Sequence, residues 1–86
     1  RYTVLVRTLQ NFAQTLYDNG YADEACRILE FAVSTRTDIS ATYKLLATIY
    51  REKGETEKIA GLIPVAKELN SSLSKHIVAA LEEFLP

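Results

Sequence analysis

Few side chains in this 86-residue sequence could support nucleophilic or metal chemistry. Cys26 is the only cysteine and His76 the only histidine, and they fall in separate helical patterns. A nucleophilic thiol needs a base close to it, and a zinc site needs several ligands at suitable spacing. His76 lies beside Ile77 with no second ligand near it in the chain, so we expect no metal site. Cys26 is expected to be an ordinary packed thiol.

The spacing of the carboxylates and the lack of known catalytic motifs also argue against an enzyme. Asp23 with Glu24, and Glu82 with Glu83, are neighbours in the chain, so on a helix each pair diverges by about 100°. The sequence has no Gly-rich phosphate loop, no His-Glu-x-x-His and no Gly-x-Ser-x-Gly pattern. We therefore predict a protein that is not an enzyme and needs no cofactor.

Composition and charge narrow the class of partner. Apolar residues make up 48% and charged residues 24%, as in a folded globular protein. The net charge of −1 argues against general binding to nucleic acid or to an anionic membrane. No apolar run of about 18 residues occurs, so no membrane insertion is expected in this segment. The start at Arg1, without Met or a signal-peptide pattern, predicts a piece of a longer protein, whose compartment and membrane tethering stay open.

A polar stripe on two predicted helices offers the remaining binding chemistry. On the first helix the stripe consists of Arg7, Gln10, Gln14 and Tyr17. Adding 34 to these numbers gives Ala41, Lys44, Thr48 and Arg51 on the later helix, so the same face is again polar and partly basic. The seven candidate peptide-binding residues are Arg7, Gln10, Gln14, Tyr17, Lys44, Thr48 and Arg51. Because the stripe carries cations and hydrogen-bonding groups, we expect an extended ligand that is acidic or ends in a free carboxylate.

Apolar residues recurring at steps of three and four predict the helices that position this stripe. The five predicted helices span residues 3–18, 22–35, 39–53, 56–69 and 73–84. Gly20 and Gly54 are expected to end the first and third helices, because glycine adopts a left-handed conformation without steric cost. Asp38 and Thr56 are the expected N-caps of the third and fourth.

Pro64 interrupts the fourth apolar pattern. A proline inside a helix removes one backbone donor and clashes with the preceding turn. Together with Gly61 it predicts a kink or an interruption between Gly61 and Val65. The fifth helix has no partner helix after it, so we expect it to cap the last apolar surface with a polar outer face.

The apolar pattern repeats at a constant offset of 34 residues, which indicates a stacked repeat architecture. Phe12, Ala13, Leu16, Gly20, Leu29 and Ala32 are matched by Leu46, Ala47, Tyr50, Gly54, Ile63 and Ala66. The small residues of each unit would let paired antiparallel helices approach closely, while the larger ones fill the space beside them.

The two units resemble the tetratricopeptide repeat (TPR), whose period is 34 residues. The pattern is carried by Leu9, Phe12-Ala13, Leu16, Gly20, Ala25, Leu29 and Ala32, and again by Tyr43, Leu46-Ala47, Tyr50, Gly54, Ile63 and Ala66. Ile59 departs from it where a small residue is usual, and Thr37 and Ser71 stand where proline usually closes a unit. The resemblance implies an all-α superhelix of antiparallel helix hairpins that binds proteins.

The expected organisation is one TPR-like domain over residues 1–86. It contains repeat 1 at about 6–39, repeat 2 at about 40–71 and a capping helix at about 72–85. The two-carboxylate clamp of the family is not reproduced, because Gln10, Gln14 and Ala41 stand at the clamp-like positions.

Three function classes follow from these patterns. The first is an interaction module that binds an extended peptide or a partner helix in the concave trough. The alternative is a structural module whose open helix faces mediate self-association, such as a homodimer, or dock on the rest of a larger protein. RNA binding by related 35-residue repeats is opposed by the net charge and by the spacing of 34.

Overall fold

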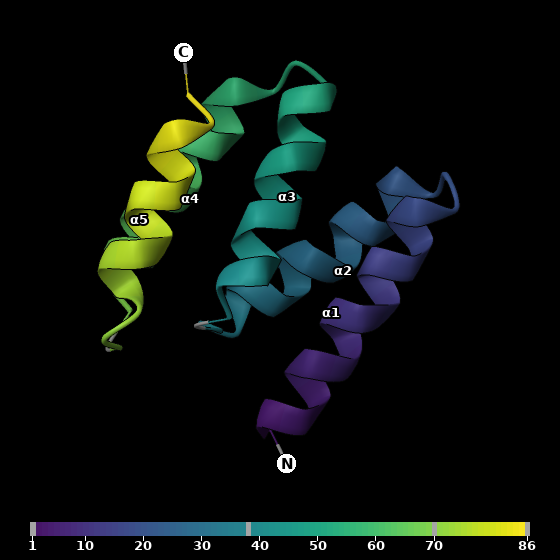
Figure 1. Cartoon of the computed structure of the whole chain (residues 1–86), viewed down its shortest axis with the longest axis horizontal. Coiled ribbons are helices and arrows are strands. Elements are labelled where there is room, and N and C mark those ends of the chain that lie inside the picture. Colours follow the sequence, from purple (N-terminus) through teal and green to yellow (C-terminus); the bar gives the residue numbers. More distant parts are fainter. Residues whose placement is uncertain (1, 38, 70, 86) are drawn as a thin grey trace.

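Most apolar residues at helical spacing become the inner sides of five helices (Figure 1). Leu5 and Phe12 of the first helix are exceptions, because each is 54% exposed, so the expectation that Phe12 fills the space between packed helices is wrong. The computed structural model describes residues 2–37, 39–69 and 71–85. Its elements are α1 (Tyr2–Asp18), α2 (Ala22–Ser34), α3 (Ser40–Glu52), α4 (Thr56–Lys67) and α5 (Ser74–Glu83). These residues contain no strand, so the predicted all-α class with five helices is confirmed. Each helix boundary lies within two residues of its predicted position.

Each helix packs on the next one along the chain, and α3 contacts all four others. α1 also touches α3, and α3 touches α5, whereas α2 and α4 make no contact through their described residues. The smallest extent of the Cα trace is 16 Å, which fits two layers of helices packed 8–10 Å apart. We therefore assign α1, α3 and α5 to one layer and α2 and α4 to the other. In Figure 1 α5 lies in front of α4.

The turns after α1 and α3 have the same backbone geometry. Gly20 and Gly54 have φ values of +88° and +77°, as expected for residues that end a helix in the left-handed conformation. The N–H of Gly20 donates to the Tyr17 carbonyl, and the N–H of Tyr21 donates to the Leu16 carbonyl. Adding 34 to each of these four numbers gives the corresponding hydrogen bonds around Gly54. The sequence offset of 34 is thus also an offset in backbone structure.

The core is built around α3. Tyr43, Leu46 and Ala47 of that helix are fully buried, and so are Ala13 of α1 and Leu29 of α2. The other large, fully buried apolar residues are Ile49, Ile59, Ile77 and Leu81. The completely covered alanines lie where small side chains were expected to allow close helix packing.

For α4, the predicted N-cap and the predicted interruption at Pro64 are wrong, whereas the alternative of a kink at Pro64 stays a prediction. The N-cap of α4 is Glu55, not Thr56, and that residue makes no side-chain capping bond. Pro64 lies inside an α-helix that runs unbroken from Thr56 to Lys67. Both Pro64 and Ala60 are exposed, so water can reach the Ala60 carbonyl that loses its helical donor, which lowers the cost of the proline.

The remaining local expectations have mixed outcomes. Asp38, the expected cap of α3, lies outside the described residues, and the capping position is Ile39. α5 buries Ile77 and Leu81 and exposes His76 and Glu83, so it has the polar outer face expected of a capping helix. No helix in the described part of the chain is long and apolar enough to cross a membrane.

Candidate functional site

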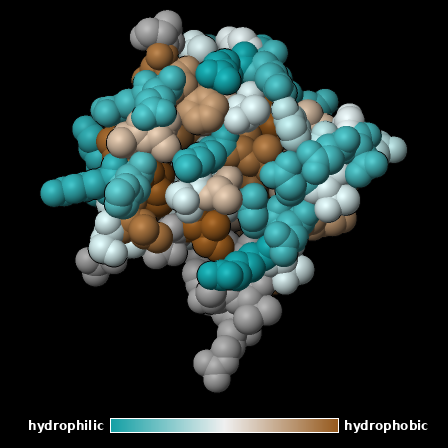
Figure 2. All heavy atoms as spheres, in the orientation of Figure 1, coloured by the Kyte–Doolittle hydropathy of each residue, from teal (hydrophilic) through white to brown (hydrophobic). Residues whose placement is uncertain are grey.

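The seven predicted peptide-binding residues lie on α1 and α3, which are neighbours in one layer. We call this set the α1–α3 polar face. Arg7, Gln14, Lys44 and Arg51 are exposed, whereas Gln10, Tyr17 and Thr48 are half-buried. The view in Figure 2 shows separate hydrophobic areas between hydrophilic side chains rather than one continuous hydrophobic surface.

Two hydrogen bonds cross from α1 to α3 at this face. The Tyr17 hydroxyl donates to Oε2 of Glu52 over 2.7 Å. The Thr42 hydroxyl donates to Oε1 of Gln10 over 3.2 Å. The hydrogen bond to Glu52, with a smaller contribution from burial, raises the pKa of Tyr17 above its ordinary value. Tyr17 and Gln10 are therefore held by the fold rather than loosely displayed.

Three other members of the face also have partners. Nε2 of Gln14 donates to Oδ1 of Asp18 over 2.9 Å. The Thr48 hydroxyl donates to the backbone carbonyl one turn earlier in α3. The guanidinium carbon of Arg51 lies 4.8 Å from the ring centroid of Phe84, which joins α3 to the end of α5 by a cation–π contact.

Arg7 and Lys44 differ from the other five residues. Neither side chain makes a hydrogen bond, an ion pair or a ring contact with another described residue. Both are exposed, and both lie in the N-terminal halves of their helices. These are the two cations of the face that remain available to a negatively charged ligand.

The structure also brings together a polar cluster that the sequence patterns did not predict. The Tyr50 hydroxyl of α3 donates to the Glu30 carboxylate of α2, and Lys53 pairs with Asp23. Beside them is a small cavity of about 240 Å³. Its lining residues are Asp23, Cys26, Arg27, Glu30, Lys53, Glu55 and Lys58.

The pKa shifts in this cluster follow from burial and from the contacts that join α2 to α3. Burial is the main cause that raises the pKa of the Cys26 thiol, and the negative charge of Glu30 raises it further. Burial and the bond to Glu30 raise the pKa of Tyr50 well above its ordinary value. Both shifts favour the protonated form of these groups at neutral pH, so neither group is activated as a nucleophile by its surroundings. The cluster instead fixes α2 against α3.

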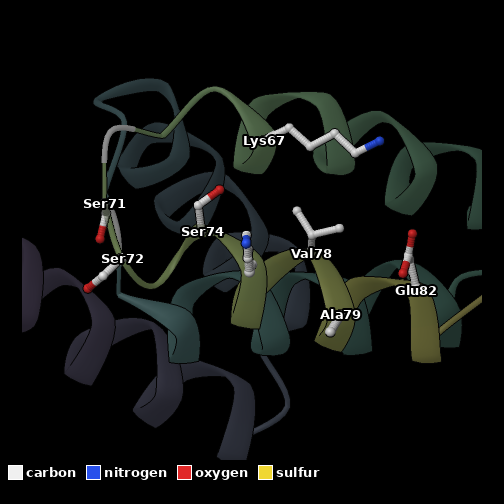
Figure 3. Close-up of a pocket in the computed structure, with 8 residues that line it drawn as sticks. Lys67, Ser71, Ser72, Ser74, Val78, Ala79 and Glu82 are labelled. Carbon is white, nitrogen blue, oxygen red and sulfur yellow. The ribbon is translucent and has the colours of Figure 1, made fainter.

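A larger cavity of about 620 Å³ opens between α4 and α5. In Figure 3, Lys67 extends from α4 above Val78, while Ser74 and Glu82 point from α5 toward α4. The Ser74 hydroxyl donates to the Ala66 carbonyl over 2.6 Å, so it is part of the helix packing. The lining carries two lysines, Lys67 and Lys75, and one carboxylate, Glu82, which opposes an anion that the lysines would attract.

Metal ligation has no support in the part of the chain that the structure describes. No three His, Cys, Asp or Glu side chains there come together as a group that could hold an ion. His76 is exposed on α5, and Cys26 is buried as expected.

Fold and site together define an all-helical protein with an internal 34-residue pattern and a mixed polar face on two helices of one layer. Comparisons with protein-family models, with curated proteins and with solved structures found no match to this chain.

Proposed function

We propose that this chain is a non-catalytic interaction module of the TPR type that binds an extended peptide or a partner helix on the α1–α3 polar face. The observation that carries the proposal is the pair of cations Arg7 and Lys44, which have no side-chain partner among the described residues and lie next to hydrogen-bonding side chains held by the fold. Fixed donors and acceptors suit recognition, because little side-chain entropy is lost when a ligand binds.

The distribution of charge suggests how a ligand would be oriented. α1 and α3 both run from bottom to top in Figure 1, so their N-terminal halves lie at the same end of the face. Arg7 and Lys44 are in those halves. The C-terminal ends carry the two carboxylates Asp18 and Glu52 and one cation, Arg51, which lies over the Phe84 ring. A carboxylate would be attracted to the cationic end and repelled from the acidic end. The proposed ligand therefore places its acidic residue or free carboxyl terminus near Lys44.

The test is a selection from a random peptide library whose members end in a free carboxylate, followed by titration calorimetry. In the double variant Arg7→Ala, Lys44→Ala, a selected peptide should bind at least about tenfold more weakly. Arg51 is left unchanged, because its contact with Phe84 would mix binding with stability.

The matched control is Arg27→Ala, Lys67→Ala, which removes two exposed cations from α2 and α4. It should bind the peptide as the parent does, and both double variants should unfold at the parent's temperature. An empty selection, or equal binding by the parent and the Arg7, Lys44 variant, would refute a peptide site on this face.

A structural docking role is the second candidate, and a separate observation favours it. Leu5 and Phe12, two large apolar residues of α1, are exposed at the end of the helix array. Scattered apolar residues on a surface are normal, but aligned ones on one helix face indicate an interaction surface.

A further inference from the structure

The cavity between α4 and α5 is bordered by three charged side chains that have no ion-pair partner among the described residues. They are Lys67 of α4 and Lys75 and Glu82 of α5, and all three are exposed. None of them makes a hydrogen bond with another described residue. The cavity volume of about 620 Å³ lies in the range of small-molecule sites. These three charges are therefore available to a ligand in the cavity.

The two charged residues of α5 lie at opposite ends of the cavity lining. Lys75 and Glu82 are seven positions apart. At a rise of 1.5 Å per residue, they are separated by about 10 Å along the helix axis. Val78 lies between them on the same side of α5, and Figure 3 shows Lys67 extending above it from α4. The lining is thus cationic at one end, aliphatic in the middle and anionic at the other end.

The openness of this cavity is not explained by the place of α5 at the end of the described helices. α5 begins at Ser74, 34 positions after the start of α3. Adding 34 to Ala41, Lys44 and Thr48 of α3 gives the cavity residues Lys75, Val78 and Glu82. On α3, which contacts all four other helices, these three positions are still exposed or half-buried. Helix packing in this array therefore leaves them accessible, unlike the position that Phe12 shares with Leu46.

We propose that the cavity between α4 and α5 binds a small linear molecule with a carboxylate at one end and an ammonium group at the other, about 10 Å apart. Free tripeptides have this form, because three extended residues span about 10 Å. The carboxylate pairs with Lys75, the ammonium group pairs with Glu82, and the chain between them covers Val78. Lys67, above Val78, donates to a carbonyl oxygen in the middle of the ligand.

The two signs of charge in the lining select a ligand that carries both. A simple carboxylate can pair with Lys75 but gains nothing from Glu82, and a simple amine gains nothing from the lysines. A dipolar ligand forms both ion pairs. Because ion pairs between exposed groups are weak, each pair should tighten binding by about two- to fivefold. The site shares no residue with the α1–α3 polar face, so it does not depend on the function proposed above.

The probe is 8-aminooctanoate, whose two charged groups are about 10 Å apart in the extended molecule. Octanoate and octylamine are matched analogues, because each lacks one of the two charges. In titrations of the ¹⁵N-labelled chain followed by NMR, 8-aminooctanoate should shift the amide signals of Lys67, Lys75 and Val78 in a saturable way. It should bind about two- to fivefold more tightly than either analogue. Trialanine with free ends should shift the same signals, and its acetylated and amidated form should not.

Two variants assign the contacts. Glu82→Gln should bind 8-aminooctanoate only as tightly as octanoate, and its affinity for octanoate should equal that of the parent. Lys75→Gln should bind 8-aminooctanoate only as tightly as octylamine. The control is Glu57→Gln, which removes an exposed carboxylate of α4 outside the cavity lining and should leave every affinity unchanged.

Several outcomes would overturn the proposal. One is the absence of saturable binding of 8-aminooctanoate below about 10 mM. Another is equal binding of octanoate and 8-aminooctanoate, which would mean that Glu82 takes no part. A third is that the shifts centre on Leu5 and Phe12, which would mean adsorption to exposed apolar residues. The variant Arg7→Ala, Lys44→Ala should bind the probe as the parent does, so failure here and failure of the peptide site are distinguishable.

Discussion

Two equivalent residues of the repeated pattern should differ strongly in what they contribute to stability. Leu46 of α3 is 0% exposed, and Phe12 of α1, 34 positions earlier, is 54% exposed. We predict that Leu46→Ala destabilises the fold much more than Phe12→Ala, although Phe12 loses more atoms. The physical reason is that α2 covers this face of α3, whereas no described helix covers the equivalent face of α1.

The magnitudes follow from burial. Truncating a fully buried leucine to alanine costs about 2–5 kcal/mol, because the transfer free energy is lost and a cavity remains. Full burial of a large apolar side chain stabilises by about 1.5–3 kcal/mol, so Phe12, with less than half of its surface covered, contributes about 1 kcal/mol. A chain of this size has a total stability of about 4–13 kcal/mol, so Leu46→Ala removes a large share of it.

Urea unfolding followed by far-ultraviolet circular dichroism measures both effects. The dependence of the unfolding free energy on urea should be the same in parent and variants, so that midpoint shifts report stability. The thermal midpoint should fall by about 4–8 °C for Phe12→Ala and by more than about 10 °C for Leu46→Ala. Equal losses in the two variants would refute the assignment of buried and open faces to equivalent positions.

Three further predictions concern packing, backbone and pH. Ala47→Leu should cost about 1–3 kcal/mol in a thermal melt because Ala47 is completely covered, whereas Ala41→Leu, at an exposed site of the same helix, should cost almost nothing. Gly20→Ala should cost about 1–2 kcal/mol in urea because its φ is +88°, whereas Gly61→Ala, inside α4 with open space around it, should stabilise by about 0.5–1 kcal/mol. The pKa of Tyr50 is raised above 10.0 by burial and by Glu30, so its contribution is complete below pH 10 and is lost as pH rises toward the folded-state pKa. The thermal midpoint of the parent should therefore fall more steeply above pH 10 than that of Tyr50→Phe; parallel curves would contradict this linkage.

Most of the fold could be predicted because its signals are local. Apolar residues at steps of three and four mark each helix, and Gly20 and Gly54 stop two of them through their own backbone freedom. The wrong cap and the wrong interruption in α4 are also local, since Thr56 and Pro64 were interpreted from propensity alone. Exposure of Pro64 to solvent makes an unbroken helix tolerable there, and exposure is a property of the packed molecule.

Part of the candidate site could also be predicted from local spacing, and part could not. The α1–α3 polar face could be found because its members follow helical spacing and recur at the offset of 34, so the pattern predicts that they share a surface. The pairs Tyr50–Glu30 and Lys53–Asp23 join residues 20 and 30 positions apart. They exist only because α2 crosses α3 at a particular place, and no periodicity within either helix encodes that crossing.

The exposed apolar residues of α1, Leu5 and Phe12, show why a repeated sequence does not fix a repeated environment. Phe12 and Leu46 occupy one position of the pattern, but Leu46 has α2 before it and Phe12 begins the described array. Burial in a stacked helix array comes from the neighbouring hairpin, so the same apolar residue stabilises the fold inside the array and is left exposed at the end of the described array. The sequence pattern assigned Phe12 to the core because it contains no information on which neighbouring helix is present. The exposed side of α1 is recognised only when the exposures of equivalent residues, such as Phe12 and Leu46, are compared in the structure.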